Sequence, residues 1–544
     1  MKLKRILCLI FAVLMVLTVG CGKKDAGDDS SFSPSDSTQN PRSDISLLWS
    51  ADDTLNPYTA KTELNRKLSL LMFDPLVKLD GEFQPQLILA KSAEPDGKDY
   101  IVTLKSAVFS DGTPVTADDV VFTLNKLLKT ELPYKQQLSI VKSYKAESTD
   151  TVRFTLTKAD PYFKNLLDFP IIKKDSDDRH DENNIQLPPI GSGRYIFDSK
   201  TKTLTANKMW VMGTVNVPTV ELIDAPDSTV EKYNLEANNV SCYQTDLSDG
   251  VIPPMSGNTS LLELNNLVYL GVNLNSATIS REKARYAISA ALDRTAICNN
   301  AYHGYAKPAA GLFNSVWHDA GALQNITSTP NLEIVVANFE EMGYNSKDED
   351  GFLLNDKNKT LTLKLVSYKD NARRDAAAAL VKQQLEAVGI KIELVSLSWD
   401  DYIKALTWGN FDLYIAETKI PNNMDVTELV TSGGSLGYGI PEPKTVTAEK
   451  NEDENKTDEN KTDENKTDKS NETTVVSSVP LLDNAVKGFY SENLSLVDII
   501  NAFNAEMPII PLCHRQGLTV CEATIDSSKM SSVSDAYFGI ANIK

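Results

Sequence analysis

Acidic and amide side chains gather in one glycine-rich stretch, residues 411–439, with the sequence FDLYIAETKIPNNMDVTELVTSGGSLGYG. The stretch starts as an apolar, strand-like run and continues into a loop that carries Glu417, Asn423 and Asp425. A carboxylate in a poorly solvated cleft forms charge-assisted hydrogen bonds that are stronger than neutral ones. The glycines that follow allow a backbone to approach a ligand closely. The stretch therefore predicts a binding site, with a turn cap or a surface pair between Glu417 and Lys419 as the structural alternative.

Aromatic residues are candidate walls for such a site, namely Trp49, Tyr58, Trp317 and Tyr438. Any one aromatic side chain is more often part of a core than of a ligand contact. Asn273, which lies in an apolar run, is a further candidate for contact with a ligand.

Patterns for catalysis or for metal binding do not occur in the sequence. Four histidines are scattered along the chain without HExxH or another metal-ligand spacing. Residues 433–437 match Gly-x-Ser-x-Gly in letters, but they lack the strand before and the helix after that a nucleophile elbow requires. We predict a binding protein that is not an enzyme, with no catalytic residue, no metal site and no cofactor.

The N-terminus predicts export. Basic residues precede an apolar run at residues 6–19, which is shorter than the about 17–25 residues that cross a bilayer. Residues 1–20 therefore read as a signal peptide. The ending Leu-Thr-Val-Gly-Cys resembles a bacterial lipoprotein cleavage box, which makes Cys21 the lipid-bearing first residue of the mature chain. Ordinary secretion is the alternative.

Residues 21–43 are rich in Ser, Asp, Pro and Gly, which is typical of a flexible tether. Lipid on Cys21 and this tether would hold the folded body at the outer face of the cytoplasmic membrane in the cell envelope. In a Gram-negative cell, that face is the periplasmic side.

The net charge argues against nucleic acid and anionic lipid as partners. The chain has 74 acidic and 55 basic residues, a net charge of −19. Removing residues 1–20 takes away three bases, so the mature chain has 55 − 3 = 52 bases and a net charge of −22. Such acidity repels polyanions.

We expect the protein to be a monomer.

Two apolar runs organise the chain. Residues 266–275 alternate like a strand, and residues 508–518 near the C-terminus look like a return partner. We interpret them as crossovers between two lobes with the ligand in between. In the second lobe, strands alternate with helices at 371–388 and 399–407, which predicts a mainly parallel sheet that binds ligands at the carboxyl ends of its strands.

Residues 447–474 contain the repeat KTDEN and no large apolar residue. Such a segment cannot bury enough surface to offset the entropy of ordering it. We predict a disordered loop inserted in the second lobe, with a charged interaction tail as the alternative.

The cysteines of the mature body have no CxxC spacing. Cys513 and Cys521 could pair, or they could be two buried residues on neighbouring strands.

Several ordered motifs resemble one family. They are LMFDPLVKLDGEFQPQLILAKSAE, YIVTLKSAVFSDGTPVTADDVVFTL, PIGSGRY, YLGVNLN and REKARYAISAALDRTAI. Together they resemble the bacterial family-five extracellular solute-binding proteins, the peptide/nickel-type receptors of ABC importers. The resemblance implies an α/β, two-lobed, periplasmic-binding-protein-like fold of class II, with lobes joined by two crossover strands. Lobe I would comprise residues 44–266 and 515–544, with an extra subdomain at about 75–190, and lobe II residues 267–514.

The resemblance also implies a function. The protein would capture oligopeptides and deliver them to an ABC permease and its ATPase. Glu417 aligns best with the acidic residue that binds the α-amino group of the peptide, and Asp425 is the alternative. Ser192 and Gly193 would offer backbone hydrogen bonds to an extended peptide. A nickel or other metal chelate, an oligosaccharide, or a signalling role in peptide sensing are the alternatives.

Overall fold

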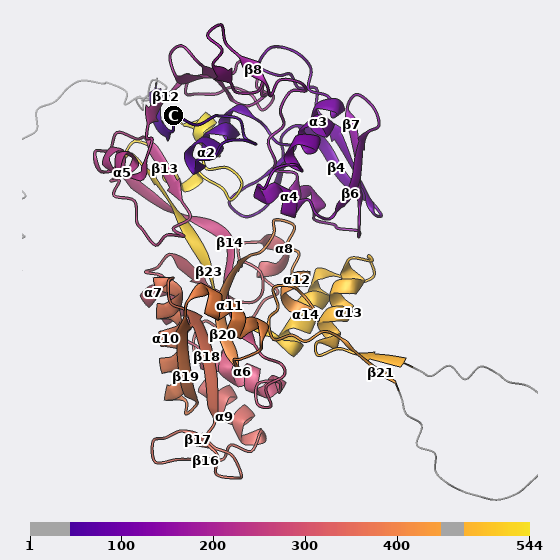
Figure 1. Cartoon of the computed structure of the whole chain (residues 1–544), viewed down its shortest axis with the longest axis vertical. Helices are drawn as coiled ribbons and strands as arrows, with labels where there is room; N and C mark the ends of the chain where they lie inside the picture. The colour runs from indigo at the N-terminus through magenta and orange to yellow at the C-terminus, as the bar shows by residue number, and fades with distance from the viewer. Residues whose placement is uncertain (1–43, 448–472, 544) are drawn as a thin grey trace, which may run out of the picture. The chain divides into compact units, whose positions relative to one another are not determined.

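The computed structural model describes residues 44–447 and 473–543 (Figure 1). The predicted signal peptide, Cys21 with its tether, and residues 448–472 of the predicted insertion lie outside these ranges. Within the described ranges, none of the helices combines the length and apolarity needed to cross a membrane. These residues form two lobes, with one apolar core mainly in lobe I and two mainly in lobe II, and a seven-stranded sheet whose strands β13, β14 and β23 reach from lobe II into lobe I.

Lobe I is built on a four-stranded sheet in the order β1-β12-β11-β10. β1 runs parallel to β12, and the other neighbours are antiparallel. Alternate residues of β1 point into the core, where they meet the apolar face of α2. The bounds are β1 Asp44–Trp49, α2 Glu63–Met72, β10 Tyr195–Asp198, β11 Thr203–Ala206, β12 Thr219–Asp224 and α5 Ser228–Glu236.

A second antiparallel sheet, in the order β4-β5-β7-β6, lies within the range predicted as an inserted subdomain. Helix α3 packs on it and starts with a capping box formed by Thr116 and Asp119. The bounds are β2 Val77–Leu79, β3 Pro85–Leu87, β4 Ala90–Asp96, β5 Asp99–Leu104, α3 Ala117–Leu127, α4 Pro133–Gln137, β6 Val141–Ala146, β7 Thr151–Leu156, η1 Phe163–Leu166, β8 Arg179–His180 and β9 Gln186–Leu187.

Lobe II contains three parallel strands, β20, β18 and β19, as the alternation of strands and helices predicts. The prediction of a mainly parallel sheet is nevertheless wrong. The whole sheet has the order β13-β23-β14-β20-β18-β19, with β15 beside β23, and every pair outside the three parallel strands is antiparallel. The bounds are β13 Cys242–Thr245, β14 Asn258–Val272, β15 Ala306–Pro308, β18 Thr362–Tyr368, β19 Lys391–Leu397, β20 Leu413–Lys419 and β23 Ile509–Cys521.

β14 and β23 are the two crossover strands, and they run side by side in Figure 1. Their ladder slips between Glu263 and Leu267, and beyond this irregularity β14 pairs with β20 of lobe II. The apolar run predicted as the crossover lies past that point, because Val268, Leu270 and Val272 are buried in the core of lobe II. The chain therefore passes between the lobes in the N-terminal half of β14, where its side chains are less covered.

Helices cover both faces of the lobe II sheet and bury two separate apolar clusters. The predicted helix at 371–388 is α10, and Gly389 with φ 97° follows its end. The helix predicted at 399–407 is α11. The bounds are α6 Glu282–Ala291, α7 Arg294–Asn300, α8 His318–Gly321, α9 Leu332–Glu341, β16 Ser346–Lys347, β17 Leu353–Leu354, α10 Ala372–Ala387, α11 Trp399–Thr407, α12 Thr427–Val430, β21 Lys444–Thr447, β22 Thr473–Val476, α13 Pro480–Phe489, α14 Leu496–Glu506, η2 Ser527–Lys529 and η3 Ile540–Asn542.

Cys513 and Cys521 carry free thiols and lie on one strand, β23. Eight residues of extended strand separate them by about 26 Å, far beyond the about 7 Å that a disulfide spans between Cα atoms. Both predicted arrangements, a bonded pair and a pair on neighbouring strands, are wrong.

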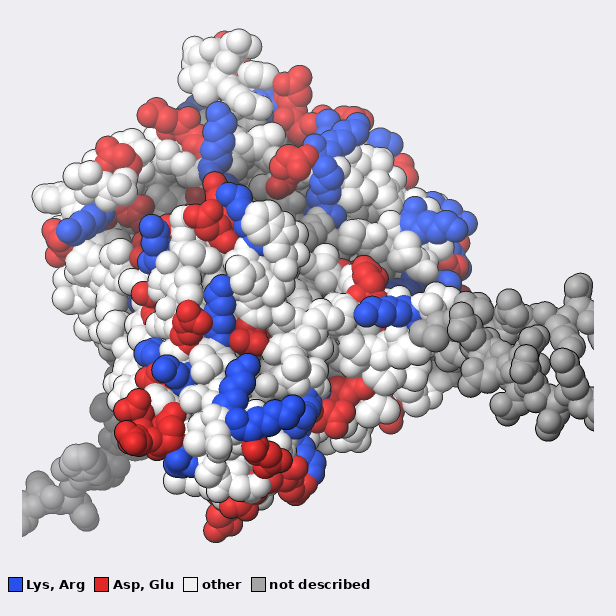
Figure 2. Space-filling view, turned by 60° about the horizontal axis from the view of Figure 1, so that its bottom comes forward, with Lys and Arg blue, Asp and Glu red and all other residues white. Residues whose placement is uncertain are grey.

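Acidic and basic side chains are interspersed over the face shown in Figure 2. No long basic stripe of the kind that binds nucleic acid crosses that face.

Candidate functional site

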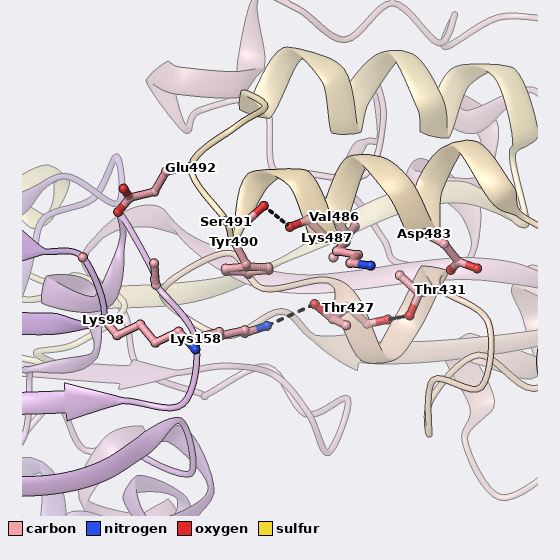
Figure 3. Close-up of a pocket in the computed structure, with 12 residues that line it drawn as sticks. Lys98, Lys158, Thr427, Thr431, Asp483, Val486, Lys487, Tyr490, Ser491 and Glu492 are labelled. Atoms are coloured by element: carbon pink, nitrogen blue, oxygen red, sulfur yellow. Dashed lines mark hydrogen bonds between the residues drawn. The ribbon is translucent and has the colours of Figure 1, made fainter.

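A groove of about 660 Å³ lies between the lobes (Figure 3). One wall comes from the β4–β5 turn and from the residues after β7 in lobe I, and the other comes from α12 and α13 in lobe II. Because neither lobe supplies both walls, a ligand in the groove would contact both lobes at once. The walls include Lys98, Lys158, Thr427, Thr431, Asp483 and Tyr490.

Lys158 is the charged side chain that ties the two walls together. Its Nζ lies 2.7 Å from Asp425 Oδ2 and 3.5 Å from the centre of the Tyr490 ring. Burial alone would raise the pKa of Asp425, but Lys158 and hydrogen bonds from Thr427 outweigh it and lower this pKa. Asp425, predicted to contact the ligand, is therefore ionised and has a lysine of lobe I as its partner.

The loop after β20 docks on lobe I through buried amide groups. Asn423 Nδ2 donates to Asp160 Oδ2 at 2.7 Å, and Asn422 Nδ2 donates to Asp168 Oδ2 at 2.9 Å. Asn165 Nδ2 in turn donates to the carbonyl oxygen of Asn422 at 3.1 Å. We refer to these contacts, with the Lys158–Asp425 pair, as the interlobe latch. Its members are Lys158, Asp160, Asn165, Asp168, Asn422, Asn423 and Asp425.

Both lobe I carboxyls of the interlobe latch have a raised pKa. Burial raises the pKa of Asp160 to about 6, although the Asn423 hydrogen bond opposes the shift. Burial also raises the pKa of Asp168. Burying the negative charge of these two carboxylates is costly. Contact between the lobes should therefore depend on pH.

Tyr162 carries an aromatic contact across the same boundary. Its ring lies edge-on to Trp317 at 5.1 Å and stacks with Phe489 at 6.2 Å, both in lobe II. Its hydroxyl donates to Asp319 at 2.9 Å. Trp317, proposed from the sequence as an aromatic wall, is 1% exposed and packs beneath Tyr162.

Glu417 lies at the carboxyl end of β20, and its carboxylate faces guanidinium groups. Arg515 Nε donates to Oε1 at 2.6 Å, and Asn266 Nδ2 donates to the same atom at 2.8 Å. Arg374 Nη2 lies 4.0 Å from Oε2. Two arginines, and not Lys419, are thus the cationic neighbours of Glu417. Its predicted contact with a peptide amino group stays a prediction.

The predicted site residues of lobe I lie in or near its core. Trp49 is buried with its ring 5.8 Å from Phe197, and the buried Tyr58 hydroxyl donates to a backbone carbonyl. Ser192 is also buried. Gly193 donates its amide to the last turn of α2, and a Cβ on it would lie 2.4 Å from a backbone carbon. Close packing against α2 explains this glycine, and ligand contact at these four positions stays a prediction.

Two predicted residues lie on lobe II. Asn273 Nδ2 donates to the carbonyl oxygens of Gly409 and Phe411 at 3.0 and 2.9 Å, which ties the end of β14 to the turn before β20. Tyr438 is half-buried, with its ring 6.3 Å from that of Tyr414.

Sequence reasoning missed Asp160, Arg374 and Arg515. A weak signal existed for Arg374, because two consecutive arginines open α10, where the helix dipole disfavours positive charge. Nothing local in the sequence marks Asp160 or Arg515, since their partners lie more than 90 residues away in the chain.

Among residues 44–447 and 473–543, no group of three or more His, Cys, Asp or Glu side chains could hold a metal ion.

The sequence pattern of the bacterial extracellular solute-binding proteins, family 5 Middle, matches residues 82–436. The oligopeptide-binding protein AppA of Bacillus subtilis (strain 168) is 24% identical over 441 residues, which cover 76% of this chain and 80% of AppA. The glutathione-binding protein GsiB of Salmonella typhi is 23% identical over 359 residues, which cover 63% of this chain and 67% of GsiB.

Solved structures share the fold. A nickel ABC transporter protein from Bacillus halodurans aligns with a TM-score of 0.69 at 17% identity, covering 91% of this chain and 98% of the other. The murein tripeptide binding protein MppA in its unliganded open form aligns with a TM-score of 0.69 at 17% identity, covering 92% and 97%. At these identities the likeness concerns the fold alone.

Proposed function

We propose that this chain, which belongs to the bacterial extracellular solute-binding proteins of family 5, captures oligopeptides between its lobes for delivery to an ABC permease. The observation that carries the proposal is the groove whose walls come from both lobes. A ligand that contacts both walls favours the arrangement in which the lobes meet. The permease would then distinguish the loaded receptor from the empty one by this arrangement.

The chemistry of the walls supports a peptide. Lysine and acidic side chains offer charge-assisted partners for carboxylates and ammonium groups, and Tyr490 and Val486 offer apolar contact. The relatives AppA and GsiB are named for binding an oligopeptide and glutathione. We propose no catalytic activity, so wild type and Ser435→Ala should be equally inactive in peptidase and esterase assays.

Equilibrium dialysis against a mixed peptide library, read by mass spectrometry, tests the proposal. We expect enrichment of a subset of peptides by the wild-type protein, and mass spectrometry of the purified protein should detect the same class. Lack of enrichment of any peptide would refute the substrate assignment.

A metal chelate is the second candidate ligand, favoured by the likeness to the nickel ABC transporter protein of Bacillus halodurans. Such a complex would be held through the groove lysines and Tyr490 and not by direct ligation. Calorimetry with nickel–histidine decides between the two, because tight binding of this chelate and none of peptides would favour the second candidate.

We further propose that lipid on Cys21 anchors the protein to the outer face of the cytoplasmic membrane. The lipoprotein-like cleavage box supports this proposal. Replacing Cys21 with serine should release the protein into the soluble fraction and abolish labelling with a fatty-acid analogue. Unchanged membrane association of Cys21→Ser would contradict the anchor.

A further inference from the structure

Two cysteines face each other at the lobe I end of the crossover strands. β13 begins at Cys242, β23 ends at Cys521, and the two residues are direct partners in the antiparallel pairing of these strands. Both belong to the apolar core of lobe I, both act on the buried Tyr537, and their exposed fractions are 3% and 0%. In the structure both carry thiol groups. Two thiols that are 521 − 242 = 279 positions apart in the chain thus meet in one core.

The hydrogen bond beside this pair defines its geometry. Glu522 N donates to the carbonyl oxygen of Ser241 at 2.9 Å, so the next position of the ladder, Cys242 opposite Cys521, is a non-hydrogen-bonded pair. The Cα atoms of such a pair lie about 4.5 Å apart, and their side chains leave the same face of the sheet. Disulfides join Cα atoms that are about 4.4–6.8 Å apart. The backbone therefore holds the two cysteines at a distance that a disulfide spans.

Cys521 is also held on its other side. It is the partner of Asn258 at the start of β14, and a side chain on Gly257 would collide with its carbonyl oxygen. This close approach fixes the end of β23 between β13 and β14, and the three strands can be followed in Figure 1. A covalent bond at this point joins the outer strand β13 to both crossover strands.

The other two cysteines of the described residues provide a comparison. Cys298 of α7 forms a hydrogen bond with Cys513 of β23 in a core of lobe II. Burial raises the pKa of Cys513 well above its ordinary value, and this hydrogen bond adds to the shift. Because the thiolate is the form that attacks a disulfide, the folded protein keeps Cys513 as a thiol. A helix and a strand also share no ladder that would set the distance between their Cα atoms.

We propose that Cys242 and Cys521 form a disulfide in the exported protein. This inference rests on the location proposed above, because disulfides persist outside the cytoplasm and are rare within it. A thiol–disulfide oxidant of the cell envelope, R–S–S–R, accepts the two electrons. One cysteine thiolate attacks this oxidant and expels the first R–S⁻. The second cysteine thiolate attacks the mixed disulfide, forms the bond between the two cysteines and expels the second R–S⁻. Each expelled thiolate takes up one of the two cysteine protons.

The bond has two structural consequences. Both sulfurs are buried in the folded protein, so the exchange takes place while the exported chain folds. The bond closes a loop that contains lobe II, and it stabilises the protein by restricting the unfolded chain. It ties the crossover strands on the lobe I side of the irregularity between Glu263 and Leu267. The walls of the groove in Figure 3 come from elements other than β13 and β23, so ligand binding should not depend on the bond.

Peptide mapping of the wild-type protein is the first arm of the test. The full chain is produced with its own N-terminus, recovered from the cell envelope, alkylated at harvest under denaturing conditions, and digested with trypsin without reduction. Cleavage after Arg515 separates Cys513 from Cys521, so the four cysteines fall in four different peptides. We expect a linked pair that carries Cys242 and Cys521 and is two hydrogen atoms lighter than the sum of its parts, with the other two cysteines alkylated. Alkylation of all four cysteines, or a link between the other two instead, overturns the inference.

Thermal melting with and without a thiol reductant is the second arm. The reductant should lower the Tm of wild type by several degrees and leave that of the double variant Cys242→Ser, Cys521→Ser unchanged. Cys298→Ser replaces another buried cysteine in the same way, so it is the matched control and should respond like wild type. An equal response of wild type and the double variant overturns the inference.

Peptide binding separates this inference from the proposed function. Equilibrium dialysis against the mixed peptide library should enrich the same peptides with oxidised and with reduced wild type. If peptides bind and mapping finds no link, the disulfide fails and the peptide function stands. If mapping finds the link and no peptide binds, the substrate assignment fails and the disulfide stands.

Discussion

Asn423 Nδ2 of lobe II donates a hydrogen bond to Asp160 Oδ2 of lobe I across 2.7 Å. Both side chains are almost completely buried, at 5% and 1% exposure. Two residues 263 positions apart in the chain thus form a contact that exists only while the lobes meet. Because the acceptor is a titratable group, this contact couples the association of the lobes to pH.

The pH dependence has a defined sign. Burial raises the pKa of Asp160 to about 6 from its ordinary 3.8, so the native protein binds a proton more tightly than the unfolded chain. The contribution of Asp160 to the unfolding free energy is therefore largest below pH 4 and is lost as the pH rises through 6. Relative to Asp160→Asn, the unfolding free energy of wild type should fall by about 2 kcal/mol between pH 4 and 7.

Denaturant unfolding at a series of pH values measures this difference. Asp160→Asn keeps an acceptor for Asn423, and Asp168 is unchanged in both proteins and cancels. If the difference in unfolding free energy between wild type and Asp160→Asn stays flat or rises with pH, the pKa of Asp160 is not raised by burial.

The Lys158–Asp425 pair should contribute to ligand binding because it joins the two walls of the groove. Lys158→Ala leaves Asp425 without its 2.7 Å partner and should weaken binding of the peptides enriched from the mixed library about 3- to 10-fold. The matched control is Lys91→Ala, which replaces an exposed lysine of β4 in lobe I. Dialysis of both variants checks this, and equal loss in the control would point to a general charge effect.

Glu417→Gln separates two roles for this residue. If Glu417 accepts a hydrogen bond from a peptide ammonium group, the substitution weakens binding of peptides that have a free N-terminus. A purely structural role, in which Glu417 only pairs with Arg515, predicts unchanged binding. It also predicts a lower Tm, since Arg515 loses a charge-assisted hydrogen bond worth about 1.5–3 kcal/mol. Dialysis and thermal melting on the same preparation give both readouts.

Local helices and strands are predictable from the amino-acid sequence. The period of apolar residues, the Thr116–Asp119 cap and the glycine after α10 predict helices and strands that the structure confirms. These features depend on neighbours a few residues apart, so local reading recovers them. The ordered motifs likewise placed the chain in its family and predicted two lobes with two crossover strands.

Which charged side chains meet depends on the folded arrangement of the chain. Glu417 and Asp425 were recognisable from the loop, but their partners Arg515 and Lys158 are 98 and 267 positions away. No periodicity or spacing in the sequence marks a charge pair whose members are so far apart, because only folding brings them together. The mixed sheet could not be read from local sequence either. The directions of β14 and β23 follow from the two crossings of the chain between the lobes.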